Sequence, residues 1–278
     1  MKIEIYPPLS IHEVGGRSNQ EDSLWPRSDG EAAGEHLFVV CDGMGGHEHG
    51  EVASRAVSQA LGKWFNHHAN PKKELTDAQL REAIEYAYCE LDRYDSTSSK
   101  KMGTTLTLLY IHARGITAAH IGDSRIYHVR PTQGLRYLSR DHSLAFELLQ
   151  SGEISYEDYL HYPQKNIITR VMMPGEDNRS RPDIVHITDV AADDYFYLCS
   201  DGMVEQMRDE ELADIFASGG SDEEVRDYLL HATRKNNDNH SAWIVHVKSV
   251  QCEKGDKIGD SEEVTTRYNA LNVIRKQR

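Results

Sequence analysis

The chain has 278 residues, of which 38% are hydrophobic, so it can bury a core in one large domain or two small ones. Its formal net charge of −14 and its lack of a basic stripe argue against a nucleic-acid partner. Neither a signal segment nor an apolar run long enough to span a bilayer is evident, so we expect a cytoplasmic protein without a membrane partner.

The first third of the chain mixes short strands with long helices. Apolar residues bounded by Pro or Gly predict strands at 3–5, 10–14 and 36–41. An amphipathic pattern predicts a helix over 51–65. The capping box from Thr76 to Gln79 predicts the start of a second helix.

Asp42 lies between the predicted strand at 36–41 and a loop rich in glycine. Such a loop permits close backbone approach, so an acid at this point suits a metal ion. A glycine-rich turn with a solvated aspartate is the alternative. A Walker phosphate loop is excluded, because no Gly-Lys-Ser/Thr follows the glycines.

The middle of the chain changes to strands joined by short turns. The predicted strands cover 104–112, 116–121, 126–129 and 135–138. Sequential strands with short connections form a meander, so we expect an antiparallel sheet here. The segment 141–182 then interrupts the strands with a helix over 143–150, which Gly152 stops, and with irregular chain. Insertions of this length are often lids or specificity segments.

The last third returns to strands and ends in a polar tail. We predict strands at 184–187, 195–199 and 242–247, and helices over 209–217 and 221–231. We therefore expect one domain over 1–248 and a tail over 249–278. The tail could form one short amphipathic helix that docks a partner, or it could be a frayed terminal strap.

The four cysteines, at positions 41, 89, 199 and 252, are scattered. No pair has the Cys-x-x-Cys spacing of a zinc knuckle or a redox motif. Cys41 and Cys199 each end an apolar run, so we expect buried, reduced thiols.

Four turns beside predicted strands carry acids: Glu21-Asp22, Asp42-Gly43, Asp201-Gly202 and Asp238-Asn239. Strand ends on one edge of a sandwich lie close in space, and carboxylates brought together repel each other unless a cation is present. The donors are oxygens, without cysteine or clustered histidine, so Mg²⁺ and Mn²⁺ fit better than zinc. Two such ions roughly 3.5–4 Å apart can activate a water and polarise a phosphoryl group.

Arg17 precedes the first of these acids. Its planar guanidinium could bind phosphate oxygens with two parallel hydrogen bonds. The alternative is an ordinary salt bridge to Glu21 or Asp22.

Eight motifs occur in order, at 17–22, 40–47, 103–105, 120–127, 140–143, 166–170, 198–202 and 238–239. They include Val-Cys-Asp-Gly-Met-Gly-Gly-His at 40–47 and Leu-Cys-Ser-Asp-Gly at 198–202. The series resembles the metal-dependent protein phosphatases, the type 2C serine/threonine phosphatase family, and in particular its compact bacterial branch. The resemblance runs from about residue 10 to 248. It implies an α+β fold, a four-layer β-sandwich of two antiparallel sheets flanked by helices, with metals at one end.

Carried over by position, the resemblance implies a metal centre with two ions, Mn²⁺ or Mg²⁺. Asp42 would bridge the two ions. Asp201 and Asp238 would complete the shell of one ion, and the carbonyl of Gly43 would bind the other.

The same resemblance implies roles for the remaining polar residues. Glu21 and Asp22 would act near the metals or through metal-bound water. Asp123 would join Asp201 at a weaker third metal, and Arg17 would bind the substrate phosphate. The family's flap would correspond to about 142–182.

The implied reaction is in-line attack on phosphorus by a water between the two metals, without a phosphoenzyme. Part of the family has a histidine after the Asp-Gly pair, where this chain has Met44. The general acid is therefore either His47 or a metal-bound water, and a loop-capping role for His47 is the alternative. His142 is expected to position backbone near the flap rather than to act in the chemistry.

The resemblance implies a monomeric phosphatase that acts on phosphoserine and phosphothreonine in proteins, opposing a serine/threonine kinase. A regulatory pseudophosphatase that binds a phosphoprotein without turnover is the alternative. The intact acids at 22, 42, 201 and 238, together with Arg17, favour the enzyme. A two-metal nuclease is disfavoured, because no basic groove is available for a polyanion.

Overall fold

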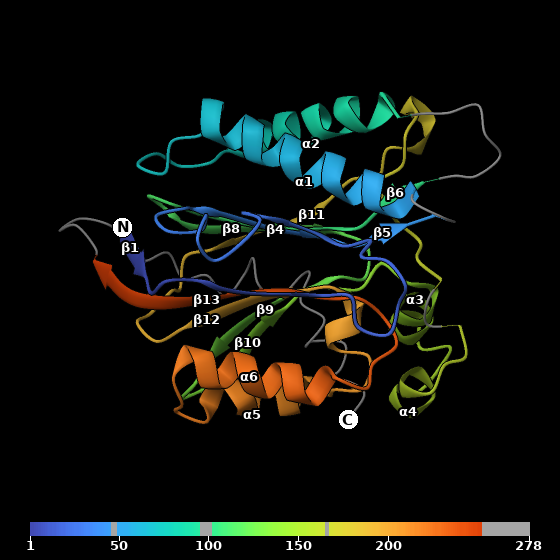
Figure 1. Ribbon diagram of the computed structural model, residues 1–278. Coiled ribbons are helices and arrows are strands. Elements are labelled where there is room, and N and C mark those ends of the chain that lie inside the picture. Colours follow the sequence, from blue (N-terminus) through green and yellow to red (C-terminus); the bar gives the residue numbers. More distant parts are fainter. Residues whose placement is uncertain (46–48, 95–101, 165–166, 252–278) are drawn as a thin grey trace.

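Two antiparallel sheets pack face to face in the computed structural model, and a pair of helices covers each outer face (Figure 1). The structure describes residues 1–45, 49–94, 102–164 and 167–251. The predicted α+β fold, a four-layer sandwich, is therefore confirmed.

The larger sheet has six strands in the order β1-β13-β12-β9-β10, and β2 also pairs with β13. Its strands are β1 (Lys2–Ile5), β2 (Leu9–Glu13), β9 (Arg125–Arg130), β10 (Gly134–Leu138), β12 (Tyr195–Cys199) and β13 (His240–Gln251). The expected boundary at residue 248 falls within β13, and the segment 252–278 lies outside the described residues.

The second sheet has five strands in the order β11-β8-β7-β4-β3. Its strands are β3 (Ser23–Trp25), β4 (Leu37–Cys41), β7 (Leu106–His112), β8 (Gly115–Ile121) and β11 (Asp183–Ile187). A separate two-stranded ladder joins β5 (Gly43–Met44) to β6 (Gly103–Thr104).

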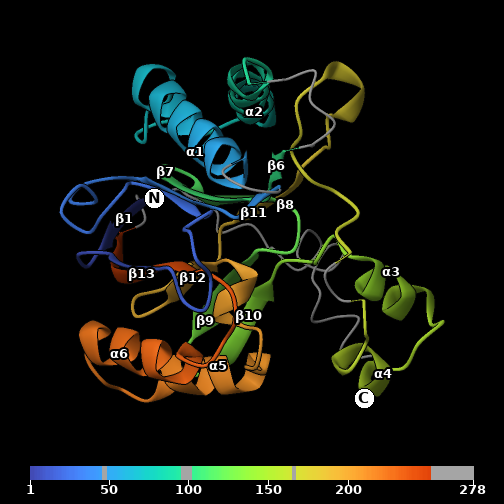
Figure 2. The same ribbon diagram turned by 45° about the vertical axis from the view of Figure 1, so that its right-hand side comes forward.

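Helices α1 (His49–His68) and α2 (Asp77–Asp92) cover the five-stranded sheet, and α5 (Asp209–Ala217) and α6 (Asp222–Thr233) cover the six-stranded one (Figure 1). The predicted capping box of Thr76 and Gln79 begins α2. Helices α3 (Leu144–Ser151) and α4 (Tyr156–Leu160) stand beside the sandwich (Figure 2). Gly152 ends α3, as predicted, whereas Ser143, which was expected inside the helix, caps its start. Among the described residues, no helix has the length and apolar character to cross a membrane.

Three apolar cores correspond to the three interfaces between the layers. In the central core, between the sheets, Phe38 meets Trp243 edge to face, with ring centroids 5.4 Å apart. Both side chains are fully buried, so this contact holds the two sheets together from the inside. Cys41 and Cys199 are buried free thiols, as expected.

The predicted meander in the middle of the chain is wrong in one respect. Strands β7 and β8 pair with each other, and so do β9 and β10, but β8 and β9 belong to different sheets. The chain crosses from one sheet to the other at Gly122–Ser124, where Gly122 has a φ of +105°. A side chain disfavours that backbone conformation, so glycine permits the sharp change of direction.

Candidate metal centre and adjoining cavity

The predicted acids gather at one end of the sandwich from both sheets. Asp22 precedes β3 and Asp42 follows β4, whereas Asp201 follows β12 and Asp238 precedes β13. Asp123 lies in the crossover between the sheets. The negative charge of Asp201 raises the pKa values of Asp22, Asp42 and Asp123, so these carboxylates are electrostatic neighbours.

Enclosure by protein is the largest cause of these pKa shifts, and the neighbouring charges add to it. Together they raise the pKa of Asp22 to about 7 and that of Asp201 to about 6, and they hold the pKa of Asp42 well above its usual value. One oxygen of Asp201, Oδ1, is buried and has no hydrogen-bond partner among the described residues. An unpaired buried oxygen among repelling carboxylates fits a hard divalent cation, which prefers oxygen ligands.

Glycine follows Asp42 and Asp201 because backbone from other segments packs against these positions. A Cβ on Gly43 would lie 2.2 Å from the carbonyl oxygen of Gly50, and one on Gly202 would lie 2.1 Å from that of Asn239. Both distances are far below van der Waals contact. Each Asp-Gly pair is therefore required by close packing at the acidic end.

Glu21 and Asp22 are fixed on the same loop by hydrogen bonds. The backbone amide of Glu21 donates to Asn239 Oδ1 at 2.9 Å, and its carbonyl accepts from Gly43 N at 3.2 Å. Asp22 Oδ2 accepts from Ser200 Oγ at 2.8 Å. These bonds connect the loop to both Asp-Gly turns.

Arg17 lies at the edge of the same group, with 57% of its side chain exposed. Its Nη2 donates to Asp238 Oδ2 at 2.6 Å. The salt bridge considered from the sequence, to Glu21 or Asp22, is therefore replaced by one to Asp238. The guanidinium has further N–H donors on its exposed side for a ligand.

Thr105 connects Asp42 to the crossover that carries Asp123, a link that the sequence does not indicate. Its hydroxyl accepts from the backbone amide of Asp42 at 2.9 Å and lies 2.7 Å from Ser124 Oγ. Its side chain also packs against Gly122, where an added Cβ would be 2.6 Å from Thr105 Cγ2.

His142 braces the crossover from the other side. Its Nδ1 accepts from the backbone amide of Gly122 at 3.1 Å, and its own amide donates to the Gly122 carbonyl at 2.9 Å. These bonds support the predicted positioning role. The proton of the neutral ring is then on Nε2, which lies 3.3 Å from Asp183 Oδ2.

Clustered histidines are not evident in the sequence, yet ligand atoms of His120, His142 and Asp183 lie within 4.8 Å of one another. The two imidazoles stack with centroids 4.6 Å apart. Arg170 Nη1 donates to Asp183 Oδ1 at 2.8 Å, so a cationic side chain already balances this carboxylate. Burial alone would raise the pKa of Asp183, but the hydrogen bond from His142 and the positive charge of Arg170 lower it. We interpret this group as a structural brace between the segment predicted as a flap and the crossover.

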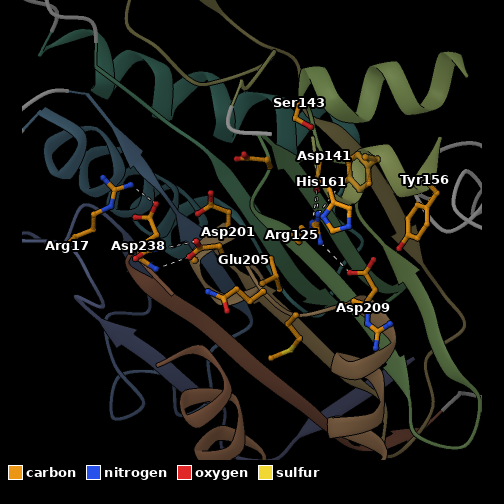
Figure 3. Close-up of a pocket in the computed structure, with 18 residues that line it drawn as sticks. Arg17, Arg125, Asp141, Ser143, Tyr156, His161, Asp201, Glu205, Asp209 and Asp238 are labelled. Atoms are coloured by element: carbon orange, nitrogen blue, oxygen red, sulfur yellow. Dashed lines mark hydrogen bonds and ion pairs between the residues drawn. The ribbon is translucent and has the colours of Figure 1, made fainter. Parts of the chain in front are cut away.

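A cavity of about 650 Å³ begins at the acidic end, where Asp123, Asp201 and Asp238 line it. It runs past Glu205 toward Tyr156 of α4 (Figure 3). One of its walls is therefore formed by the segment predicted as a flap. His47 lies outside the described residues.

Comparisons with known proteins agree with this geometry. The family model for protein phosphatase 2C matches residues 10–245. The serine/threonine phosphatase stp of Listeria welshimeri is 31% identical over 222 residues, which are 79% of this chain and 86% of the relative. The structure also matches the solved structure of serine/threonine phosphatase Stp1 from Staphylococcus aureus, with a TM-score of 0.74 and 28% sequence identity. The match covers 90% of this chain and 96% of that one.

A further solved structure is the catalytic domain of the serine/threonine protein phosphatase PstP in complex with two manganese ions. It matches with a TM-score of 0.72 at 26% identity and covers 88% of this chain and 99% of that one. The resemblance seen in the sequence is thus confirmed over most of its length, and the chain belongs to the protein phosphatase 2C family of metal-dependent phosphatases.

Proposed function

We propose that this protein hydrolyses phosphoserine and phosphothreonine in protein substrates, with Mn²⁺ or Mg²⁺ as its cofactor. The observation that carries the proposal is the group of enclosed carboxylates, among them Asp201 with its unpaired Oδ1, at one end of a cavity. Family membership and the names of the relatives support the same reaction class.

In this proposal, Asp42, Asp201 and Asp238 hold two metal ions together with the carbonyl of Gly43. Asp123 contributes to a weaker third site. When bound, the two ions would activate a water for attack on phosphorus and offset charge on the phosphoryl oxygens. Manganese in the PstP structure supports this type of cofactor.

The remaining polar residues prepare the site for substrate. Arg17 orients the phosphate through N–H donors that its bond to Asp238 leaves free. Glu21 and Asp22 act near the metals or through their water ligands. His47 is a candidate general acid for the leaving oxygen, by its position in the sequence.

The physiological substrate is proposed to be the product of a serine/threonine kinase, and the enzyme to act as a cytoplasmic monomer. The relatives named as serine/threonine phosphatases support a phosphoprotein substrate. No observation on the described residues favours the pseudophosphatase alternative.

Release of phosphate from a phosphothreonine peptide tests the proposal, with Mn²⁺, with Mg²⁺ and with a chelator. We expect turnover that requires the metal, and a loss of at least about 100-fold in Asp42→Asn, because removing a metal ligand removes most of the charge stabilisation. A folded Asp42→Asn protein with near-normal turnover would contradict the two-metal assignment. Metal binding without turnover in the wild type would favour the pseudophosphatase.

A further inference from the structure

The cavity extends well beyond the acidic end. Figure 3 shows Asp201 and Asp238 toward one end, Glu205 in the middle, and Asp209 and Tyr156 toward the other end. A phosphoryl group at the acidic end would fill only part of about 650 Å³. The remaining length has room for the substrate residues that flank the phosphorylated one.

The arginines along this length are already neutralised. Arg125 donates to Asp141 through Nε at 2.8 Å and through Nη2 at 2.6 Å, and its Nη1 lies 3.3 Å from Asp209 Oδ1. Arg208 donates through Nη2 to Glu211 at 2.7 Å. Two carboxylates thus surround Arg125, so this part of the wall carries a net negative charge and offers little to an acidic substrate side chain.

Glu205 is different, because the structure gives it no ion pair with any described residue. Its Oε2 accepts from Asn237 N at 2.8 Å, and its Oε1 accepts from Asn237 Nδ2 at 3.2 Å. The side chain is exposed and lines the cavity. Neutral amide donors leave its charge available to a cation from solvent or from a ligand.

Apolar and aromatic groups face the same space. Tyr156 of α4 is half-buried and stacks on Tyr159, with ring centroids 6.2 Å apart. Val204 and Met207, on the segment before α5, are also half-buried and line the cavity. Such a surface suits the long aliphatic stem of Lys or Arg, whose charged end then reaches a carboxylate.

We propose that this arm of the cavity selects phosphopeptides with Lys or Arg within about three residues of the phosphorylated residue, and that Glu205 is the specificity-determining carboxylate. The proposal rests on the proposed phosphatase function. The chain's net charge of −14 favours the same substrates at longer range.

The test compares kcat/KM for two phosphothreonine peptides that differ only in having Lys or Glu at the flanking positions. We expect the Lys peptide to be preferred about 2- to 10-fold at low ionic strength, which corresponds to gaining one exposed ion pair and avoiding one repulsion. The ratio should shrink in about 0.5 M salt, because salt screens exposed charges. Hydrolysis of p-nitrophenyl phosphate, which has no flanking residues, reports on the reaction centre alone.

The variant Glu205→Gln removes the charge but keeps an oxygen that accepts from the Asn237 amide. For Glu205→Gln, we expect the ratio of kcat/KM for the Lys peptide to that for the Glu peptide to approach 1. For Glu205→Lys, we expect the Glu peptide to be preferred. Glu223→Gln, an equal charge change at an exposed site on α6, is the matched control and should keep the wild-type ratio.

Two outcomes would overturn the proposal. One is an equal kcat/KM for the Lys and Glu peptides with the wild-type enzyme, a result that does not depend on the folding of any variant. The other is a wild-type ratio that persists in Glu205→Gln, which would leave Glu205 as a brace for Asn237 only. Failure to hydrolyse p-nitrophenyl phosphate with any divalent metal would instead refute the phosphatase function, so the two failures are distinguishable.

Discussion

Asp201→Asn should stabilise the metal-free protein near neutral pH although it removes a proposed metal ligand. The pKa of Asp201 is raised from 3.8 to about 6, first by enclosure and then by the charge of Asp238. A shift of about 2 units corresponds to about 3 kcal/mol at 1.36 kcal/mol per unit. Because part of the side chain faces the cavity and is screened by water, we expect a gain of about 2 kcal/mol in the free energy of unfolding.

The sign of the pH dependence follows from the direction of the shift. The folded-state pKa of Asp201 lies above the unfolded one, so between about pH 4 and pH 6 the folded wild type binds more protons than the unfolded chain. Its stability therefore falls as pH rises through that window. Asp201→Asn does not lose stability in this way. The difference in the free energy of unfolding between the variant and the wild type should therefore be near zero at about pH 4 and reach its full value above about pH 6.

Urea unfolding in the presence of a chelator measures the effect, at about pH 4.5 and about pH 7.5. Asp214→Asn, at an exposed position on α5, is the control and should change stability by less than about 0.5 kcal/mol. Saturating Mn²⁺ should reverse the order, since a ligand at 100 times its Kd adds about 2.7 kcal/mol to the wild type. A variant that is less stable than the wild type in chelator at both pH values would refute the reasoning.

Three further predictions concern single contacts. Arg17→Ala should raise KM for a phosphopeptide about 10-fold with little change in the urea midpoint, because its guanidinium is proposed to bind the phosphate and its exposed ion pair with Asp238 adds little to stability. An unchanged KM would contradict this. Gly202→Ala should cost about 1–3 kcal/mol in urea unfolding, since its Cβ would meet backbone, whereas a Cβ on Gly30 would only be in van der Waals contact with Ser28 Oγ at 3.9 Å, so Gly30→Ala should cost less. Tyr159→Phe should lower the free energy of unfolding by about 1 kcal/mol, because the Tyr159 hydroxyl accepts a hydrogen bond from Arg125 Nη2 at 3.3 Å. The control is Tyr162→Phe, since the Tyr162 hydroxyl has no hydrogen bond in the described structure. An equal loss of stability in both variants would argue against a contribution from the Tyr159 bond.

Features with a local signal in the sequence were predictable. The short apolar runs before Asp42 and Asp201 predict the strands that end beside these residues, and the capping box predicts the start of α2. The short helix α4 was missed although Ser155 and Asp158 form a capping box. A helix of five residues adds too few periodic positions to be recognised by its apolar pattern.

Contacts between distant segments could not be predicted in the same way. The turn at Gly122 has the composition of a hairpin, and only the packing of the two sheets makes it a crossover. Thr105 belongs to the motif at 103–105, but nothing in the local pattern indicates its bond to Asp42, 63 positions earlier in the chain. The bond of Arg17 to Asp238 was likewise not predictable, because Asp238 lies in the loop before β13, 221 positions later in the chain.

The division of the acids between two sheets gives the central core an influence over the reaction centre. If one sheet slid across the other, Asp42 would move relative to Asp201, because the two residues follow strands of different sheets. The hydrogen-bonded pairing of strands within each sheet does not by itself prevent that movement. Resistance to that shear comes from side chains that interlock between the sheets, such as Phe38 against Trp243. A displacement of about 1 Å is enough to impair catalysis, so the alignment of the acids depends on apolar residues that never touch the substrate.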